Sequence, residues 1–350
     1  MSRVALAPGR RVRVSVPATS ANLGPGFDAF GLALSLRDEL TVEVVEAGVH
    51  VEVNGEDDGS RGEANLIARA VAAGLALAGA SAPGLALTCE NRIPHGRGLG
   101  SSAAAIVAGV LAGAHLGRPA DPGDPDPDPS DLTGGPAKPP VPHQEIFRVA
   151  HELEGHPDNV AAALYGGFTV AWVPDSGPPG ALRADPPAAV LPVLYVPTVR
   201  QLTAQARAAL PERIPHVDAA GAVGRASALA LLLAGGRPAG ERPAKDAAGA
   251  PSAQLSALSA LSALLMELTA DRLHQPYRLP AAPATAALVT TVRAAGIPAV
   301  LSGSGPTVLA LAAGPADRAR AARLVPEGFT AHLLDVEQAG ARVEEFEEAG

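Results

Sequence analysis

Residues 94–104 read Pro-His-Gly-Arg-Gly-Leu-Gly-Ser-Ser-Ala-Ala, a glycine-rich turn that leads directly into an alanine-rich segment. The glycines at 96, 98 and 100 allow the backbone to approach a bulky anion closely. The hydroxyl groups of Ser101 and Ser102 follow at the point where a helix would begin. A helix N-terminus offers unpaired N–H groups and the positive end of the helix dipole. This stretch therefore predicts a phosphate-binding turn.

The composition describes a globular chain that is long enough for two domains. Its 350 residues are 47% hydrophobic but only 3% aromatic, so the core must consist mainly of Ala, Val and Leu. The formal net charge of −9 argues against binding to nucleic acid or to an anionic membrane surface. A polyanionic ligand would therefore need a local cradle, such as the turn at 94–104.

The single cysteine, Cys89, excludes an intrachain disulfide and a cysteine-based zinc site. Residues 1–24 contain no apolar segment of the kind found in a secretion signal. Three apolar stretches are rich in Ala and Gly and are interrupted by Pro83, His115 and Arg225, so we expect soluble helices there, not membrane spans. These stretches are 66–88, 102–117 and 219–236. We expect a cytoplasmic enzyme with no membrane partner.

The distribution of lysine excludes two common classes of phosphate-binding enzyme. Lysine occurs only at positions 138 and 245, both in segments rich in Pro, Ala and Gly. A P-loop nucleotidase needs a lysine directly after its glycines, and a protein kinase needs one on a strand. Any clamp for a phosphate or a carboxylate must therefore use arginine.

Strand and helix patterns are mixed along the chain without the regular alternation of a doubly wound sheet, which indicates an α+β fold. Alternating apolar and polar residues predict strands at 11–16, 40–46 and 49–53, the last two as a hairpin around Gly48. Further strands are expected at 85–90, 167–173, 190–196, 298–302 and 307–312. Helices are expected at 64–80, 101–116, 143–154, 157–165, 200–210, 218–234, 254–271 and 283–295.

Two segments rich in Pro, Gly and polar residues interrupt these patterns, and both are expected to be exposed loops. They are a low-complexity insertion at 119–142 and a second loop at 236–253. The Pro/Gly cluster at 174–187 is the most plausible linker. We therefore place one domain at 1–180 and a second at 181–350.

Polar loops supply candidate ligands for a small molecule. The loop at 17–28 sets Asn22 and Asp28 among flexible glycines, where they could bind an amine and a hydroxyl group. Asp158 and Asn159 lie at an expected helix start, where the simplest interpretation is an N-cap with a polar neighbour. The segment at 271–278 ends a helix with two arginines and a histidine, which would also suit a solvated helix end.

The segment His151-Glu-Leu-Glu-Gly-His156 resembles the zinc-binding pattern H-E-x-x-H but departs from it. Its histidines are five residues apart, and Gly155 interrupts the helix, so the two rings do not share one face. Glu152 and Glu154 remain candidates for Mg²⁺, which takes carboxylate and hydroxyl oxygens beside phosphates.

Taken together and in this order, the motifs resemble those of the GHMP small-molecule kinases and, within them, the homoserine kinase family. Three GHMP signatures are present: the loop at 17–31, the turn at 94–104, and Leu301-Ser-Gly-Ser-Gly-Pro-Thr307. The homoserine kinase marks are Thr-Ser-Ala-Asn-Leu-Gly-Pro-Gly-Phe-Asp at 19–28, Glu-Gly-His-Pro-Asp-Asn at 154–159, and Asp-Arg-Leu-His-Gln-Pro-Tyr-Arg at 271–278. One departure is Ser304, where the family usually has Ala.

The resemblance implies ATP-dependent phosphorylation of L-homoserine to O-phospho-L-homoserine in threonine biosynthesis, with Mg²⁺ as cofactor. It also implies a two-domain GHMP kinase fold. The N-terminal domain would resemble domain 2 of ribosomal protein S5, and the C-terminal domain would be ferredoxin-like. We further expect a homodimer.

The resemblance also implies roles for the matching residues. ATP would contact Pro94, His95, Gly96, Arg97, Gly98, Leu99, Gly100, Ser101, Ser102, Ala103 and Ala104, with Asn65 near the adenine. Homoserine would contact Asn22, Asp28, His156, Asn159, Thr203, Arg207 and Arg278. Ser102, or Ser101 in its place, would hold Mg²⁺ together with Glu154, for which Glu152 is the alternative.

The residues expected to act on the reacting groups are Asp158, Asn159 and Arg207. Related GHMP kinases use an aspartate base helped by a lysine, and Asp158 stands at the aspartate's place, but no structured motif here contains a lysine. The mechanism is therefore expected to rest on positioning and charge stabilisation, with Asn159 orienting the hydroxyl group. Whether Asp158 acts as a base stays open.

Two alternatives remain at this point. One is a GHMP kinase acting on a mevalonate-type or sugar alcohol, although such enzymes would lack the 271–278 segment. The other is a GHMP-fold sensor that binds ligand without turnover, although the phosphate-turn serines and the acidic metal ligand are retained.

Overall fold

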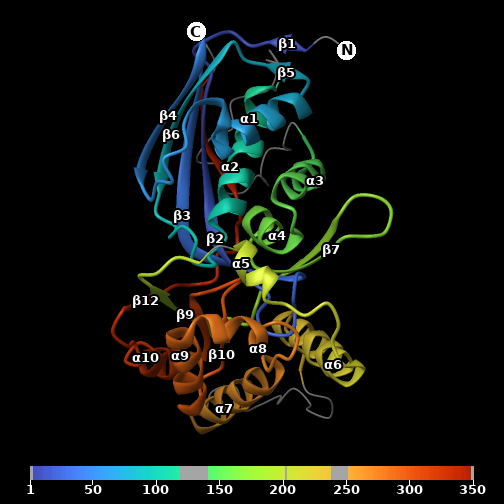
Figure 1. Ribbon diagram of the computed structural model, residues 1–350, viewed down its shortest axis with the longest axis vertical. Coiled ribbons are helices and arrows are strands. Elements are labelled where there is room, and N and C mark those ends of the chain that lie inside the picture. The colour runs from blue at the N-terminus through green and yellow to red at the C-terminus, as the bar shows by residue number, and fades with distance from the viewer. Residues whose placement is uncertain (1–2, 119–140, 202, 238–250, 348–350) are drawn as a thin grey trace.

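The computed structural model describes residues 3–118, 141–201, 203–237 and 251–347, which form two layered units (Figure 1). In the upper unit of Figure 1, the described strands form a seven-stranded sheet whose main path is β13-β2-β3-β6-β4, with β7 paired to β3 and to β8. These strands are β2 (Arg11–Ala21), β3 (Phe30–Val45), β4 (Gly48–Gly55), β6 (Gly84–Asn91), β7 (Phe168–Trp172), β8 (Gly180–Ala184) and β13 (Arg342–Glu347). A short parallel pair joins β1 (Val4–Ala5) to β5 (Ala80–Ser81).

The helices of this unit approach one another through small residues. They are α1 (Leu66–Leu77), α2 (Ser101–Leu116), α3 (His143–Glu154) and α4 (Pro157–Tyr165), with a short 3₁₀ turn at Gly62–Ala64 before α1. In α2, a Cβ atom at Gly109 or Gly113 would collide with α1, so glycine at these positions allows the two helices to approach closely. The Ala/Gly-rich composition of the expected helix is thus explained by packing inside the protein.

The lower unit of Figure 1 contains a four-stranded antiparallel sheet in the order β10-β11-β9-β12. Its strands are β9 (Val190–Pro197), β10 (Ala299–Leu301), β11 (Val308–Ala313) and β12 (Phe329–Leu333). The helices of this part are α5 (Thr203–Ala208), α6 (His216–Leu233), α7 (Pro251–Leu268), α8 (Gln275–Arg278), α9 (Pro283–Ala294) and α10 (Pro315–Ala321), with a 3₁₀ turn at Leu279–Ala281. The predicted α+β class is confirmed.

Three helices begin and end where the sequence predicts. α2, α3 and α4 have the predicted bounds, and Gly155 (φ 85°) ends α3 just before Pro157 begins α4. The predicted hairpin around Gly48 is wrong, because β4 does not pair with β3. β6 lies between them, antiparallel to β3 and parallel to β4, so the contact that places β4 comes from a strand later in the chain.

The domain boundary at residue 180 stays a prediction, although two strands beyond it lie in the first sheet. β8 pairs with β7, and β13 returns from the second unit to pair with β2. The predicted insertion at 119–142 falls almost entirely outside the described residues, as does most of the predicted loop at 236–253.

α6 is long and apolar enough to cross a membrane by length and composition alone, and only a small part of it is buried inside the protein. This is weak evidence for a span. Two charged residues of α6 form ion pairs with other elements. Arg225 pairs with Glu267 of α7 (3.2 Å), and Asp218 pairs with Arg272 in the connection after α7 (3.0 Å). The expectation that the protein has no membrane partner remains a prediction.

Candidate active site

The predicted phosphate-binding turn connects β6 to α2. Gly96, Gly98 and Gly100 have φ values of 64°, 74° and 68°, in the left-handed region that favours glycine. Gly100 is the N-cap of α2, and no side chain caps the helix. The first N–H groups of α2 are therefore left for a ligand at the positive end of the helix dipole.

Two of these glycines also bring the turn against other motifs. A Cβ atom at Gly100 would collide with Oγ1 of Thr19, which donates a hydrogen bond to Oδ1 of Asn159 (2.8 Å). A Cβ atom at Gly98 would collide with the carbonyl oxygen of Ser302, whose hydroxyl donates to the Gly98 carbonyl (2.7 Å). The turn therefore touches the C-terminal half of β2, the start of α4 and the turn between β10 and β11.

A hydroxyl group and a carboxylate meet beside the start of α2. Ser102 Oγ donates to Glu154 Oε2 at 2.7 Å. Burial raises the pKa of Glu154, and the bond from Ser102 opposes that rise. The side chain of Glu152, in contrast, is 59% exposed and pairs with Arg148 at 2.7 Å. The structure therefore brings Glu154, and not Glu152, to the phosphate-binding turn.

This pair fits Mg²⁺. Its oxygens are the hard ligands that Mg²⁺ prefers, and a cation would compensate the burial of the Glu154 carboxylate. No group of three His, Cys, Asp or Glu side chains that could hold a metal occurs in the parts of the chain that the structure describes. Nucleotide phosphates and water would therefore supply the remaining ligands.

A cavity of about 200 Å³ lies beside the turn and is lined by both units of the chain. Acidic side chains on its wall are Asp28, Glu154 and Asp158, and basic ones are Arg207 and Arg278. A small zwitterion needs partners of both signs. The cavity is therefore suited to an amino acid placed next to a phosphate group.

Asp28 and Arg207 form a two-point ion pair at the cavity. Nη1 and Nη2 of Arg207 donate to the two carboxylate oxygens of Asp28 at 3.0 and 2.9 Å. The buried Nε of Arg207 has no hydrogen-bond partner among the described residues. A zwitterionic ligand could replace each partner of the pair, its ammonium group binding Asp28 and its carboxylate binding Arg207.

The loop that carries Asp28 has an unusual backbone. Asn22, Leu23 and Asp28 have φ values of 71°, 49° and 54°, which are uncommon for residues with a side chain. Asn22 stabilises the loop, since its Oδ1 accepts the Asp28 N–H (2.9 Å) and its Nδ2 donates to the Gly303 carbonyl (2.8 Å). Strain of this kind is typical of functional loops.

Arg278 is oriented by a buried histidine. Nη1 of Arg278 lies 3.2 Å from Nδ1 of His274, whose Nε2 lies 3.0 Å from the Gly24 carbonyl oxygen. Because a carbonyl oxygen only accepts, we assign the proton to Nε2 and the acceptor role to Nδ1. Burial lowers the pKa of His274, which favours the neutral ring that this assignment requires. The Phe27 ring stacks on His274 and lies 5.3 Å from the Arg278 guanidinium carbon.

The start of α4 supplies the remaining polar groups. Asp158 is 3% exposed, and burial raises its pKa to about 7, while the Asn159 N–H that donates to its Oδ1 (2.7 Å) opposes the rise. Every residue predicted to bind the substrate or to act on it lines this one cavity: Asn22, Asp28, His156, Asp158, Asn159, Thr203, Arg207 and Arg278.

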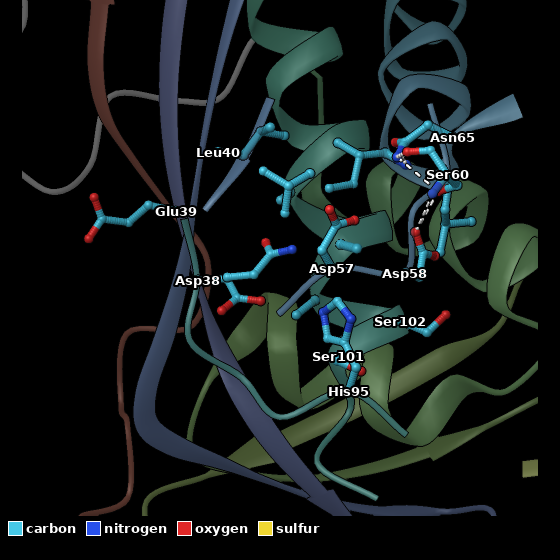
Figure 2. Close-up of a pocket in the computed structure, with 17 residues that line it drawn as sticks. Asp38, Glu39, Leu40, Asp57, Asp58, Ser60, Asn65, His95, Ser101 and Ser102 are labelled. Atoms are coloured by element: carbon cyan, nitrogen blue, oxygen red, sulfur yellow. Dashed lines mark hydrogen bonds between the residues drawn. The ribbon is translucent and has the colours of Figure 1, made fainter. Parts of the chain in front are cut away.

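A second cavity, of about 300 Å³, adjoins the first, and Ser101 and Ser102 line both. Figure 2 shows this second cavity with the two serines labelled. Leu66 and Ile67 of α1, with Ala104, Ala105 and Ala108 of α2, give it an apolar wall. Asn65 lines it too, but its side chain caps α1 through the N–H groups of Ile67 and Ala68 and donates to Ser60.

The predicted ATP contacts divide between the two cavities. His95, Ala104 and Asn65 line the second, whereas Gly96, Gly98, Leu99 and Gly100 line the first. Pro94, Arg97 and Ala103 line neither. Arg97 instead joins the turn to the end of β9, donating to the carbonyl oxygens of Pro197 (2.9 Å) and Thr198 (3.1 Å).

Sequence reasoning missed several cavity residues. Gln201 and Gly303 line the first cavity, and Asp38 lines the second. For Gly303 the signal was available, because it lies in the Gly-Ser-Gly-Pro motif. Asp38 lies within β3, outside every motif considered, and only the three-dimensional structure brings it to a cavity.

Comparison with known proteins gives matches across the chain. The family model described as GHMP kinases N terminal domain matches residues 65–167, and that described as GHMP kinases C terminal matches residues 250–330. The chain is 44% identical over 334 residues to the homoserine kinase of Streptomyces avermitilis, and the match covers 95% of both chains. It is also 44% identical over 353 residues to the homoserine kinase of Clavibacter michiganensis, covering 99% of this chain and 98% of the relative.

Solved structures of kinases also superpose on the chain over nearly its full length. A homoserine kinase from Cytophaga hutchinsonii superposes with a TM-score of 0.73 at 25% identity, covering 95% of this chain and 97% of the other. A mevalonate kinase superposes with a TM-score of 0.58 at 13% identity, covering 93% of this chain and 99% of the other. The second likeness concerns the fold alone.

Proposed function

We propose, from the premise that the chain belongs to the GHMP kinase family, that it phosphorylates L-homoserine with ATP to give O-phospho-L-homoserine in threonine biosynthesis. The observation that carries the substrate assignment is a small cavity with side chains of both charges beside a phosphate-binding helix start. The homoserine kinases to which the chain is 44% identical support the same assignment.

Homoserine fits the charges of the first cavity. Its ammonium group would bind Asp28, and its carboxylate would bind Arg207 and Arg278, which present planar donor pairs. Its hydroxyl group would then lie toward α4, near Asn159 and Asp158. Asn22, His156 and Thr203 complete the wall.

ATP fits the second cavity and the turn. The nucleoside would occupy the partly apolar cavity beside the starts of α1 and α2, and the phosphates would lie over the N-terminus of α2, where the two cavities meet at Ser101 and Ser102. Ser102 and Glu154 would hold Mg²⁺, which neutralises phosphate charge when it is bound.

Catalysis rests on positioning and charge stabilisation. The hydroxyl oxygen of homoserine forms a bond to the γ-phosphorus, and the bond from that phosphorus to the β–γ bridging oxygen breaks, releasing ADP. Asn159 orients the hydroxyl group, and the N–H groups of α2 stabilise the transferring phosphoryl group. Asp158 takes the hydroxyl proton, a role suited to a pKa of about 7.

The test is ADP release with L-homoserine compared with mevalonate, galactose and shikimate. We expect activity with homoserine well above a control without acceptor, and little with the other three. Homoserine no better than that control would contradict the assignment. A preference for mevalonate or galactose would keep the family and change the substrate, whereas binding without turnover would indicate a sensor.

We also propose that the protein works in the cytoplasm as a homodimer, without nucleic acid or membrane. The negative net charge supports the absence of polyanionic partners. Light scattering of the purified chain tests the dimer, and flotation with anionic vesicles tests the membrane. A monomer, or co-migration with vesicles, would contradict these points.

A further inference from the structure

The second cavity has a carboxylate in its wall that the proposed function does not use. Asp38 lies on β3 and lines the cavity (Figure 2). Its Oδ1 accepts the backbone N–H groups of Arg92 (2.6 Å) and Ile93 (2.8 Å). Among the described residues, its Oδ2 has no hydrogen-bond partner. One oxygen of Asp38 is therefore structural, and the other is available to a ligand.

The other carboxylates of this cavity differ from Asp38. Glu39 is engaged at both oxygens by Arg13 and Arg92, each at 2.7 Å. Asp57 is engaged at both oxygens by Arg61. Asp58 accepts from Ser60 and is exposed, so water can serve its free oxygen. Asp38 is the partly buried carboxylate of this wall that keeps an unused acceptor.

The surroundings of Asp38 define what it can bind. No Lys or Arg side chain belongs to the described lining of this cavity, so a phosphate group would be repelled there. Burial raises the pKa of Asp38 to about 6, and the two backbone N–H groups oppose that rise, so the carboxylate is mainly ionised at neutral pH. An ionised carboxylate only accepts hydrogen bonds. Its ligand must therefore be a donor group at the end of the nucleotide away from the phosphates.

We propose that Oδ2 of Asp38 accepts a hydrogen bond from the nucleoside of ATP, from the exocyclic amine of the base or from a ribose hydroxyl, and thereby sets nucleotide preference. This inference rests on the proposed function, because it needs a nucleotide in the second cavity. A site built to bind a donor group discriminates strongly against an analogue without it, since the buried acceptor is then unpaired.

The substitution Asp38→Asn separates the two roles of this side chain. The amide oxygen can still accept from Arg92 and Ile93, while the amide NH₂ replaces the free acceptor with a donor. The measurement is kcat/KM with homoserine for ATP, inosine triphosphate, 2′-deoxy-ATP and 3′-deoxy-ATP. We expect the wild type to prefer ATP over at least one analogue by about tenfold or more, and Asp38→Asn to remove most of that preference.

The analogue against which Asp38→Asn loses discrimination identifies the nucleoside group that donates the hydrogen bond. Loss of discrimination against inosine triphosphate assigns the base amine, and loss against a deoxy analogue assigns the ribose hydroxyl. If Asp38→Asn changes all four nucleotides by the same factor, or changes none, the proposal is overturned. Glu52→Gln, which removes one charge from an exposed position on β4, is the matched control and should keep the wild-type preference.

A measurement of nucleotide binding tests the role of Asp38 independently of which alcohol the enzyme phosphorylates. Calorimetric titration with each nucleotide in the absence of any alcohol should show the same order of preference and the same loss in Asp38→Asn. If homoserine is not phosphorylated but this binding pattern holds, the substrate proposal fails and the Asp38 proposal stands. If homoserine is phosphorylated and binding discrimination is unaffected by Asp38→Asn, the reverse is true.

Discussion

Asp158 is the residue at which the proposed proton transfer from the homoserine hydroxyl group can be tested most directly. Its burial raises its pKa to about 7, so the fraction able to take a proton grows as the pH rises through neutrality. We expect Asp158→Asn to lower kcat by about 10²- to 10⁴-fold with little change in the KM for homoserine. The wild-type kcat should rise with pH through about 7, and this rise should disappear in the variant. A loss below about tenfold with the rise intact would show that Asp158 is not the base.

The same residue has a predictable effect on stability. Because the folded-state pKa of Asp158 lies above the ordinary value of 3.8, the unfolded chain loses this proton at lower pH than the native protein. Asp158 therefore makes the native state progressively less stable as the pH rises from about 4 to about 7. Asp158→Asn removes this contribution, so we expect its Tm to exceed that of the wild type at pH 8 by more than at pH 4.5. An equal difference at both pH values would contradict the raised pKa.

The two serines at the start of α2 are expected to differ in function. Both line the cavities, but only the hydroxyl of Ser102 donates to Glu154 among the described residues. We expect Ser102→Ala to raise the Mg²⁺ concentration needed for half-maximal activity by about ten- to hundredfold, and Ser101→Ala to raise it much less. Magnesium titrations at saturating ATP and homoserine give the comparison. The opposite order would move the metal site to Ser101.

The connection between α7 and α8 carries His274, and this side chain orients the Arg278 guanidinium through the contact of Nδ1 with Nη1. The shorter amide of His274→Asn can place its oxygen near the position of Nδ1, where it accepts from Arg278, whereas the longer amide of His274→Gln can place its NH₂ near the position of Nε2, where it donates to the Gly24 carbonyl. We expect the Gln variant to raise the KM for homoserine about tenfold or more with a smaller change in kcat, and the Asn variant to raise it less. With 3-aminopropan-1-ol, which lacks the carboxylate, the two variants should behave alike. A difference that persists with this alcohol would indicate a general structural role.

The elements that the sequence predicted best are those with local signals. α2, α3 and α4 are bounded by Gly100, Gly155 and Pro157, whose backbone preferences act on adjacent residues. The predicted hairpin at Gly48 failed because pairing depends on β6, and β12 was missed because its partner is the distant β9. The site follows the same division. Motif residues could be assigned from the sequence, whereas Asp38 lies in an ordinary strand and is placed at a cavity only by packing.

For the whole molecule, the two units are joined more closely than a boundary at one residue suggests. The first cavity takes Asp28 and Glu154 from one unit and Arg207 and Arg278 from the other. β13 also returns to the first sheet after the second unit is complete, pairing Arg342 with Ser15 and Glu347 with Arg11. In Figure 1 both ends of the chain lie at the same end of the molecule. The first sheet is therefore complete only when nearly the entire chain is present.

This topology predicts that a chain ending at residue 341 loses stability throughout. Removing β13 leaves β2 as an open edge and removes Val343 and Phe346, which pack against the core. It also removes the contact of the Arg10 guanidinium with the Phe346 ring, whose centre lies 5.5 Å away. Two partly buried apolar side chains contribute about 2–4 kcal/mol, a large share of a typical stability of about 5–15 kcal/mol. We therefore expect a strongly lowered Tm and aggregation on expression, measured by thermal denaturation and soluble yield. A chain ending at residue 347 is the matched control and should behave as the full chain does. If the shorter chain melted at the same temperature as this control, β13 would be dispensable, and the first sheet would fold without the end of the chain.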